Sequence, residues 1–597
     1  MRRSLVLSWV LFAFHFGAFA QDKAADGPEK EKQQQTDLLL SQVAAEIPNL
    51  RLSENRSIVY ARIGSILWLT DQKQARAMFQ NAVAEMVNAL ENAGTIKKNN
   101  PYQHEILTGQ ATRPQILSTI AARDAVFALD ALYRTRPPMV AEALAYRPDT
   151  NKKISSQAQN YANIAQNEMQ LEQSFFKLAA EQNPERAAKL LKESLQKGLS
   201  YETFALLSKL YEKDPAAADE LTGPIIDKLV KNKFISAGQP DHQSLSTANT
   251  FLNNFLQKRP EGAKFVASDP ASMRLLTERL IAFYLEPTQH YYGHYLPQLI
   301  QAAEKLVPGS VARLKQVHAE NQRRLNIDPQ QESINKLLSG ESTPEMLIGE
   351  AAKYQINSRG RIYESAASKL VQQGHYDRAR QVLEDNYSDD ALENALANIK
   401  SNQISRYQNE GRFAEAEQLI DQMPESSRLS ALINLANAAF AKNKDENGAY
   451  AGALLAKARG ALPDRPENAN EMGNLLQVVS AYSSIDPEEA FRTLSGLVPQ
   501  LNELAEASIV VHGFQGGSHI RQGEMQMTNG NSLGFYIDES LFVRLAEKDF
   551  ARTTALIDGF SRREIRIQMK LQLAGVGDKD LAAGRRFRNN FVIMGRH

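Results

Sequence analysis

The chain has 597 residues, no cysteine, and 69 basic residues that balance 69 acidic ones, so its formal net charge is zero. The absence of cysteine excludes disulfides, thiolate catalysis and cysteine metal sites. A balanced charge gives no overall field that attracts nucleic acid, so we expect no nucleic-acid partner. Hydrophobic residues make up 43% of the chain, which at this length is enough to bury a large core by packing alone.

The first 20 residues have the layout of a secretory signal peptide. Arg2 and Arg3 precede an apolar run from Leu5 to Phe16, and the small-residue triplet at 18–20 follows. The run is too short to cross about 30 Å of hydrocarbon, and no later stretch has the ~20 unbroken apolar residues of a membrane span. We therefore expect cleavage after Ala20 and export to the bacterial periplasm or the cell exterior, with an uncleaved anchor as the alternative.

The mature chain begins with a polar segment and continues in a helical pattern. Residues 21–35 have low complexity and predict a flexible linker. From Thr36 onward, apolar residues recur at helical spacing, while β-alternation is nearly missing. Several helix starts are marked by a capping residue followed by proline. These starts lie in NPERAAKLL (183–191), DPAAADEL (214–221), STPEMLI (342–348) and IDPEEAFRTL (485–494).

A repeated pattern runs through the C-terminal half. QGHYDRARQVLEDN (373–386) and EGRFAEAEQLIDQM (410–423) share a glycine, an aromatic residue two positions later and an alanine three positions after that. A third copy at 547–560 keeps the aromatic residue, with Lys548 and Thr553 in place of the glycine and alanine. Weaker copies extend the pattern, and the anchors at 379, 416, 451 and 490 are 37, 35 and 39 residues apart.

This pattern resembles the tetratricopeptide repeat, in which a turn glycine ends one helix, an aromatic residue follows, and a small residue lets the second helix approach the first. The resemblance covers about residues 355–425 and lacks the family's regular 34-residue period and frequent closing proline, apart from Pro424. It implies an all-α fold, an α-solenoid of stacked antiparallel helix pairs, tetratricopeptide-like in the C-terminal half, with a concave partner-binding surface. The residues that match are Gly374, Tyr376, Ala379, Gly411, Phe413 and Ala416.

An irregular step in the repeat predicts an insertion. The anchor after 490 lies at Thr553, 63 residues further on, and residues 511–538 hold six of the 32 glycines. We interpret residues 512–536 as a Gly-rich insertion, with a short hairpin through Asn529 and Gly530. Because insertions in solenoids often emerge on the binding face, the sequence predicts that the candidate binding residues are His512, His519, Arg521 and Tyr536.

Two motifs indicate chemistry only weakly. GNSLG (530–534) matches the serine-hydrolase elbow around Ser532, but the preceding residues are polar and His597 is the one later histidine. His290 and His294 share a helical spacing that suits a metal, yet two ligands leave its coordination incomplete, so aromatic packing is favoured. We therefore predict no catalytic residues, no metal and no cofactor.

The predicted organisation has three helical segments after the linker, at 36–150, 151–330 and 331–597. Breaks rich in proline and glycine near 134–150 and 326–345 separate them. The leading hypothesis is an exported, non-catalytic scaffold that binds a protein or peptide partner. The alternative is an enzyme or small-ligand receptor with its site under the loop at 512–536. The sequence does not indicate an oligomeric state.

Overall fold

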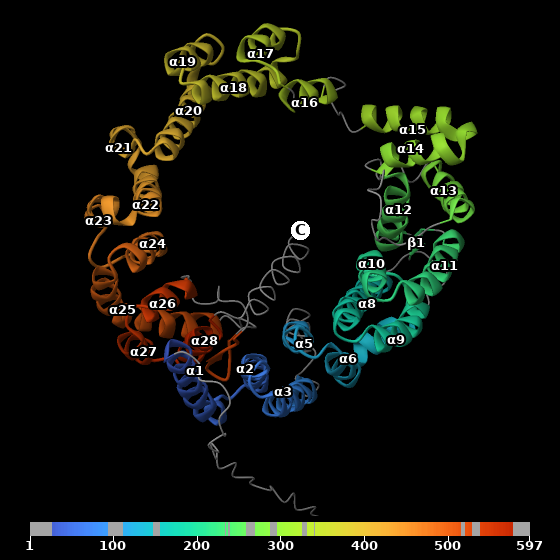
Figure 1. Cartoon of the computed structure of the whole chain (residues 1–597), viewed down its shortest axis with the longest axis horizontal. Helices are drawn as coiled ribbons and strands as arrows, with labels where there is room; N and C mark the ends of the chain where they lie inside the picture. The colour runs from blue at the N-terminus through green and yellow to red at the C-terminus, as the bar shows by residue number, and fades with distance from the viewer. Residues whose placement is uncertain are drawn as a thin grey trace, which may run out of the picture.

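The fold is a ring of stacked helices, and the two ends of the chain meet in it (Figure 1). In this computed structural model α8, α10 and α12 lie on the inner side of the ring, and α9, α11 and α13 lie outside them. The structure describes residues 27–93, 112–146, 156–232, 234–236, 239–257, 269–286, 295–324, 331–339, 341–514, 520–527 and 538–576. In these ranges, no helix is both long enough and apolar enough to cross a membrane.

The first part of the ring consists of α1 (Gly27–Glu46), the 3-10 helix η1 (Ile47–Asn49), α2 (Ser53–Leu67), α3 (Gln72–Ala93), α5 (Arg113–Ala121), α6 (Ala125–Arg134) and α7 (Pro138–Ala145). The middle part consists of α8 (Ser156–Gln182), α9 (Pro184–Lys197), α10 (Thr203–Lys213), α11 (Pro215–Lys231), α12 (His242–Leu256), α13 (Pro270–Tyr284), α14 (Leu296–Leu306), η3 (Pro308–Ser310) and α15 (Val311–Arg324).

The last part consists of α16 (Gln331–Ser339), α17 (Pro344–Ala351), α18 (Ile356–Gln373), α19 (Tyr376–Glu384), α20 (Asp389–Glu410), α21 (Phe413–Asp421), α22 (Glu425–Lys442), α23 (Lys444–Gly460), α24 (Ala469–Ile485), α25 (Pro487–Phe514), α26 (Glu539–Ala546), α27 (Phe550–Asp558) and α28 (Arg563–Ala574). Strands β1 (Ile235–Ser236) and β2 (Gln239–Pro240) form one antiparallel pair, and β3 (Ile520–Arg521) and β4 (Glu524–Met525) form another. The predicted all-α solenoid of antiparallel helix pairs is confirmed.

The predicted helix starts are confirmed. The side chains of Asn183, Asp214 and Thr343 each accept a hydrogen bond from the backbone N–H three residues later. Asp486 does the same at the start of α25. Each is followed by proline at the first helical position. A backbone N–H at this position has no partner within the helix, so its absence in proline costs nothing. A single residue therefore joins consecutive helices such as α8 and α9, and so short a connection makes them antiparallel neighbours.

The repeat glycines end their helices in the left-handed conformation, as the pattern predicts. Gly374 has φ +89° and Gly411 has φ +80°. A basic side chain from the following repeat covers each helix end, since Arg406 donates to the carbonyl of Val371 and Lys442 to that of Asn409. Glycine suits this turn for two reasons. It tolerates the positive φ, and its lack of a side chain leaves space for the basic group.

The small repeat residues are buried on the second helix of each pair. The sequence anchors fall in α19, α21, α23, α25 and α27, and side chains at all five are fully enclosed. The aromatic residues at the preceding positions link neighbouring pairs, since Tyr376 packs edge-on against Tyr407 and Phe413 lies against Tyr450. The enclosed anchor residues are Ala379, Ala416, Ala451, Ala490 and Thr553.

The hydrophobic core is continuous through the junction of the two chain ends. One cluster joins residues of α1, such as Leu39, to residues of α28, such as Leu571, and extends to Val317 in α15 and Ile404 in α20. Two smaller clusters fill α16 to α20. Within the described ranges, the large cluster has no buried member from α16 to α19, and the two smaller clusters share no buried member with it. The core is thus continuous where α1 meets α28 and divided between α15 and α20.

The N-terminal linker differs from the prediction in its second part. Helix α1 begins at Gly27, so residues 27–35 are helical and not a flexible tether. Residues 30–34 are exposed, but Leu39 and Val43 are buried in the core, and this packing sustains the helix. The predicted signal peptide and residues 21–26 lie outside the described ranges, and the three predicted segments remain an interpretation.

Candidate functional site

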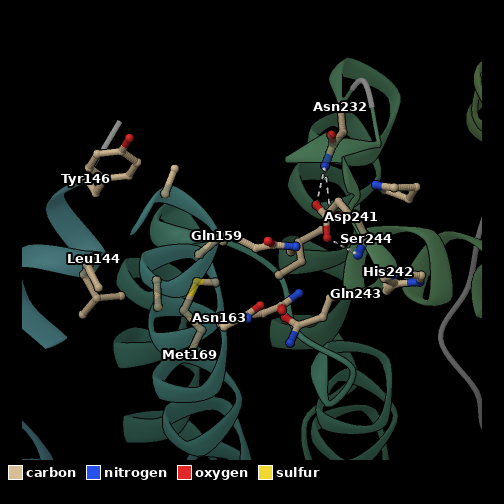
Figure 2. Close-up of a pocket in the computed structure, with 18 of the residues that line it drawn as sticks. Leu144, Tyr146, Gln159, Asn163, Met169, Asn232, Asp241, His242, Gln243 and Ser244 are labelled. Atoms are coloured by element: carbon tan, nitrogen blue, oxygen red, sulfur yellow. Dashed lines mark hydrogen bonds between the residues drawn. The ribbon is translucent and has the colours of Figure 1, made fainter. Parts of the chain in front are cut away.

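A groove of about 490 Å³ lies between the N-terminal half of α8 and the start of α12. Helix α8 has 27 residues, whereas α9 and α10, which pack along its C-terminal half, have 14 and 11. The first half of α8 therefore extends beyond these neighbours and keeps one face uncovered. Figure 2 shows this face opposite the residues that open α12.

The wall of the groove on α8 carries carboxamides and alanines. Gln159, Asn163 and Gln166 are spaced four and three residues apart, so they project from one sector of the helix. Ala162 and Met169 lie beside them and form an apolar strip. Small alanine side chains leave room for a ligand, while each carboxamide offers both donors and an acceptor.

The opposite wall is held by the cap of α12. Asp241 accepts the N–H of Ser244 at 3.1 Å, and its second oxygen accepts from Asn232 Nδ2 at 3.3 Å. Asn232 also donates to the hydroxyl of Ser244 at 2.9 Å. The Asp241 carboxylate is thus committed to fixing the helix start. Its role is to position the residues beside it.

Gln243 contributes an incompletely bonded polar group to this wall. The residue is only 2% exposed, and no hydrogen bond to Oε1 is formed within the described part of the chain. A buried acceptor without a partner costs about 1–3 kcal/mol. Figure 2 shows Gln243 extending from α12 toward α8, on which Asn163 extends toward α12. One residue that lines the groove thus carries a buried side-chain oxygen to which no described protein group donates.

The charge in the groove is modest. Burial lowers the pKa of Lys228, whose ammonium donates to the carbonyl of Leu195 at 2.6 Å. The remaining polar lining is mainly neutral carboxamide. Such a surface can hold a ligand by hydrogen bonds and close apolar contact. The groove therefore suits a neutral polar ligand better than a strongly charged one.

A buried ion cluster fixes α8 on the side away from the groove. Glu168 accepts two hydrogen bonds from Arg113, at 2.7 and 2.9 Å, and one from Arg136 at 2.9 Å. Arg136 also pairs with Glu172 at 3.2 Å. Burial raises the pKa of the Glu168 carboxyl, but hydrogen bonds and charges from both arginines outweigh it and leave that pKa below its ordinary value. The cluster ties α8 to helices α5 and α6 and so supports the groove wall.

The described residues of the predicted Gly-rich insertion are not an open loop. Helix α25 continues to Phe514, so His512 is helical, and residues 520–527 form a hairpin, which we call the closing hairpin. Its turn is at Gln522 and Gly523, where φ is +55° and +69°, the pattern of a type I′ turn. The predicted turn at 529–530 lies outside the described residues.

The closing hairpin packs between the two ends of the chain. Glu524 is 4% exposed and accepts hydrogen bonds from the backbone N–H of Arg51 at 2.6 Å and from that of Leu52 at 3.2 Å. From the other side, Glu564 of α28 accepts the N–H of Met525 at 3.0 Å. Part of the insertion is therefore buried in the junction, because the Glu524 carboxylate accepts the backbone N–H groups that precede α2.

Two of the four predicted binding residues, His512 and Arg521, lie within the described ranges. Arg521 pairs with Glu54 at 2.5 Å within the junction, which gives its guanidinium an internal partner. His512 lies in the last turn of α25. His519 and Tyr536 are outside the described ranges, as are His290, His294, Ser532 and His597. Ligand binding by these residues stays a prediction.

The sequence analysis missed the groove, although a signal for it was present. Carboxamides are unusually dense at the start of α8, which reads SQAQNYANIAQN over residues 156–167. Helical spacing places some of them on one face, but their position opposite α12 depends on contacts about 80 residues away in the sequence. Within the described ranges, no group of three or more acidic or histidine side chains is arranged to hold a metal.

The comparisons with known proteins give little further guidance. No protein-family model matches the chain, and no curated protein matches it. Among solved structures, it is similar to a "circular tandem repeat protein with novel repeat topology and enhanced subunit contact surfaces". That chain is 14% identical over 90% of this chain and 99% of its own, with a TM-score of 0.20. At this TM-score the likeness carries no weight, and the fold rests on the helices, core and junction described above.

Proposed function

We propose that the protein is an exported, non-catalytic helical-repeat scaffold that binds a protein or peptide partner. The observation that supports it is the groove between α8 and α12, an uncovered polar surface on a frame of stacked helices. Because the core continues across the chain ends, the frame is preorganised, so little conformational entropy is lost on binding.

The proposed location is the bacterial periplasm or the cell exterior. Its support is the layout of residues 1–20, with two arginines, an apolar run and a small-residue cleavage site after Ala20. Expression of the full chain followed by fractionation and N-terminal sequencing of the mature protein tests it. A cytoplasmic, unprocessed chain would contradict export.

The repeats are proposed to be tetratricopeptide-like. Support comes from the left-handed glycines at 374 and 411, the aromatic residues that open α19 and α21, and the enclosed alanines that follow. The variable spacing of the anchors remains a departure from that family's regular period. We assign the likeness to the helix-pair geometry alone.

The alternative, an enzyme or small-ligand receptor under the loop at 512–536, gains no specific observation. The described part of that segment is occupied with contacts to α2 and α28, and Arg521 is paired with Glu54. A panel of esterase, glycosidase and peptidase substrates tests the alternative directly. Reproducible turnover by the purified mature chain would favour it over the scaffold.

Partner binding is tested by chemical cross-linking of the mature chain in a bacterial envelope extract, with identification of captured proteins by mass spectrometry. The decisive step is reconstitution of each candidate with the purified chain and measurement of its Kd by calorimetry. Saturable binding at one-to-one or another fixed ratio supports the proposal. If no captured protein binds when purified, the scaffold function is contradicted.

A further inference from the structure

We propose that the groove between α8 and α12 binds an extended polypeptide segment through its backbone. This inference rests on the proposed scaffold function and names the form in which the partner is recognised. It is carried by three features of the groove: the spacing of carboxamides on α8, the apolar strip beside them, and the unused acceptor of Gln243.

The carboxamide spacing matches the repeat of an extended chain. Gln159 and Asn163 are separated by one helical step of four residues, which is about 6 Å along the axis. Two residues of an extended strand advance about 6.6–6.8 Å. A peptide lying along α8 therefore presents alternate peptide units to Gln159 and Asn163. Gln166 lies about 4.5 Å further along the axis, between one and two residues of an extended chain, so it faces the peptide units that follow.

Carboxamides suit the peptide backbone chemically. Each has an NH₂ group that donates to a carbonyl and an oxygen that accepts an N–H, so one side chain can serve both groups of a peptide unit. The alanines beside these carboxamides have small side chains, so the peptide backbone can approach α8 closely. Met169 provides an adaptable apolar surface for the ligand's side chains.

The opposite wall supplies a complementary group. Gln243 is buried and its Oε1 lacks a hydrogen-bond donor among the described residues. A small rotation of its carboxamide presents this oxygen to an N–H on the second edge of an extended peptide. A peptide backbone has donors and acceptors on both edges, so it can use α8 and α12 together.

This mode of recognition implies low sequence selectivity and weak dependence on salt. The contacts go to backbone groups that every residue but proline carries, so ligand side chains contribute little discrimination. Because Gln159, Asn163 and Gln166 are uncharged, ionic screening leaves their hydrogen bonds nearly unchanged.

The test compares two triple variants of the mature chain. The groove variant carries Gln159→Ala, Asn163→Ala and Gln166→Ala. The control variant carries Gln157→Ala, Asn160→Ala and Asn167→Ala, exposed positions on the same helix that do not line the groove. Alanine favours helix, so both variants should keep the wild-type circular dichroism spectrum and Tm.

The probe is a phage-displayed library of random linear peptides, selected on the wild-type chain and followed by fluorescence anisotropy of enriched peptides. We expect the groove variant to weaken binding by roughly tenfold or more and the control variant to leave it within about twofold, since three hydrogen-bonding groups are removed in one case only. N-methylation of alternate backbone amides in an enriched peptide should abolish binding, whereas alanine replacement of its side chains should change affinity little.

Several outcomes would overturn the inference. They are capture of no more library phage than of phage that displays no peptide, equal binding by the groove variant, and loss of affinity from side-chain replacement but not from N-methylation. A glycan array is run in parallel. If saccharides bind in the groove and peptides do not, the groove is a saccharide site and the inference is wrong. If a reconstituted protein partner binds the groove variant as tightly as the wild type, the scaffold function stands and the groove inference fails.

Discussion

Asn55 Nδ2 donates a 2.6 Å hydrogen bond to Glu524 Oε1 across a sequence separation of 469 residues. The same amide nitrogen donates to the carbonyl of Met525 at 2.8 Å, and the Asn55 oxygen accepts the N–H of Met527 at 2.7 Å. Asn55 is fully enclosed. One side chain at the start of α2 therefore bonds to the second strand of the closing hairpin and to the residue two positions after it, and so joins helix α2 to the C-terminal part of the ring.

Replacement of Asn55 by alanine should destabilise this junction. It leaves the N–H of Met527 and an oxygen of Glu524 without that partner, and each orphaned buried group costs about 1–3 kcal/mol. Chemical denaturation should show the loss. Ring opening should appear as reduced energy transfer between dyes at Ser41→Cys in α1 and Ala555→Cys in α27, since the chain has no other cysteine.

The matched control for this prediction is Glu503→Gln, which removes an exposed pair with Arg465 and none of the contacts described for the closing hairpin. Exposed ion pairs contribute about 0–1 kcal/mol, so both stability and energy transfer should stay close to wild type. Unchanged energy transfer in the Asn55→Ala chain would show that the hydrogen bonds are not what holds the ring closed.

The turn of the closing hairpin offers a stabilising substitution. Gln522 has φ +55°, a conformation that glutamine adopts reluctantly and asparagine more readily. Gln522→Asn should therefore raise the free energy of unfolding by about 0.5–1 kcal/mol, because Asn-Gly favours the type I′ turn. The carbonyl of residue 522 still accepts from Arg51 after the change. A lower stability by denaturant titration would contradict this account of the turn.

Two glycines should respond to alanine in opposite directions. Gly411→Ala places a Cβ in a left-handed turn and 2.5 Å from Lys442 Nζ, so we expect a loss of about 1–2 kcal/mol. Gly452→Ala lies inside helix α23 with no atom within 4 Å of the new Cβ, so we expect a gain of about 0.5–1 kcal/mol. Thermal unfolding of the two variants measures the difference, and equal shifts would argue against the turn role of Gly411.

The free energy of unfolding should depend on pH through the Glu168 carboxyl. Burial raises the pKa of its carboxyl, but Arg113 and Arg136 lower it more, so the folded value lies below the ordinary 4.5. A depressed pKa means that the stabilisation is complete above about pH 4.5 and is lost as the pH falls through the folded value. Glu168→Gln should cost about 3 kcal/mol at neutral pH, since it leaves the buried Arg113 without a carboxylate partner and takes one of two carboxylates from Arg136.

The difference in unfolding free energy between wild type and Glu168→Gln should shrink as the pH falls below about 4.5, because the wild-type carboxylate then also loses its charge. Glu220→Gln, which breaks an exposed pair with Lys192, is the control and should cost at most about 1 kcal/mol. A pH-independent difference for Glu168→Gln would contradict the ionic role of the cluster.

Much of the secondary structure was predictable because its signals are local. Asp214 and Asp486 cap helices within three residues, and Gly411 turns the chain at its own position, so each acts through neighbours in the sequence. The enclosed positions of Ala416 and Thr553 followed from helical spacing in the same way. Residues 27–35 were mispredicted because packing further along α1 sustains a helix that their polar composition disfavours.

The tertiary contacts of the insertion could not be predicted from nearby residues. Its glycines indicated turns, and a turn is present at Gly523, but nothing near Glu524 in the sequence reveals that its carboxylate binds the start of α2. The groove is similar, because Asn163 and Gln243 line the same groove only after the intervening helices have packed. Their relative position depends on the summed rotations between stacked helices, a quantity that no short sequence window contains.

The helices, their caps, the repeat turns and the enclosed small residues follow from local sequence signals, since backbone propensity and amphipathic spacing act over a few residues. Three features became evident from the folded chain alone: α28 meets α1 and α2, part of the predicted loop is buried in that junction, and α8 leaves a face uncovered toward α12. These relationships arise from long-range packing, in which small angular steps between helix pairs add up around the ring.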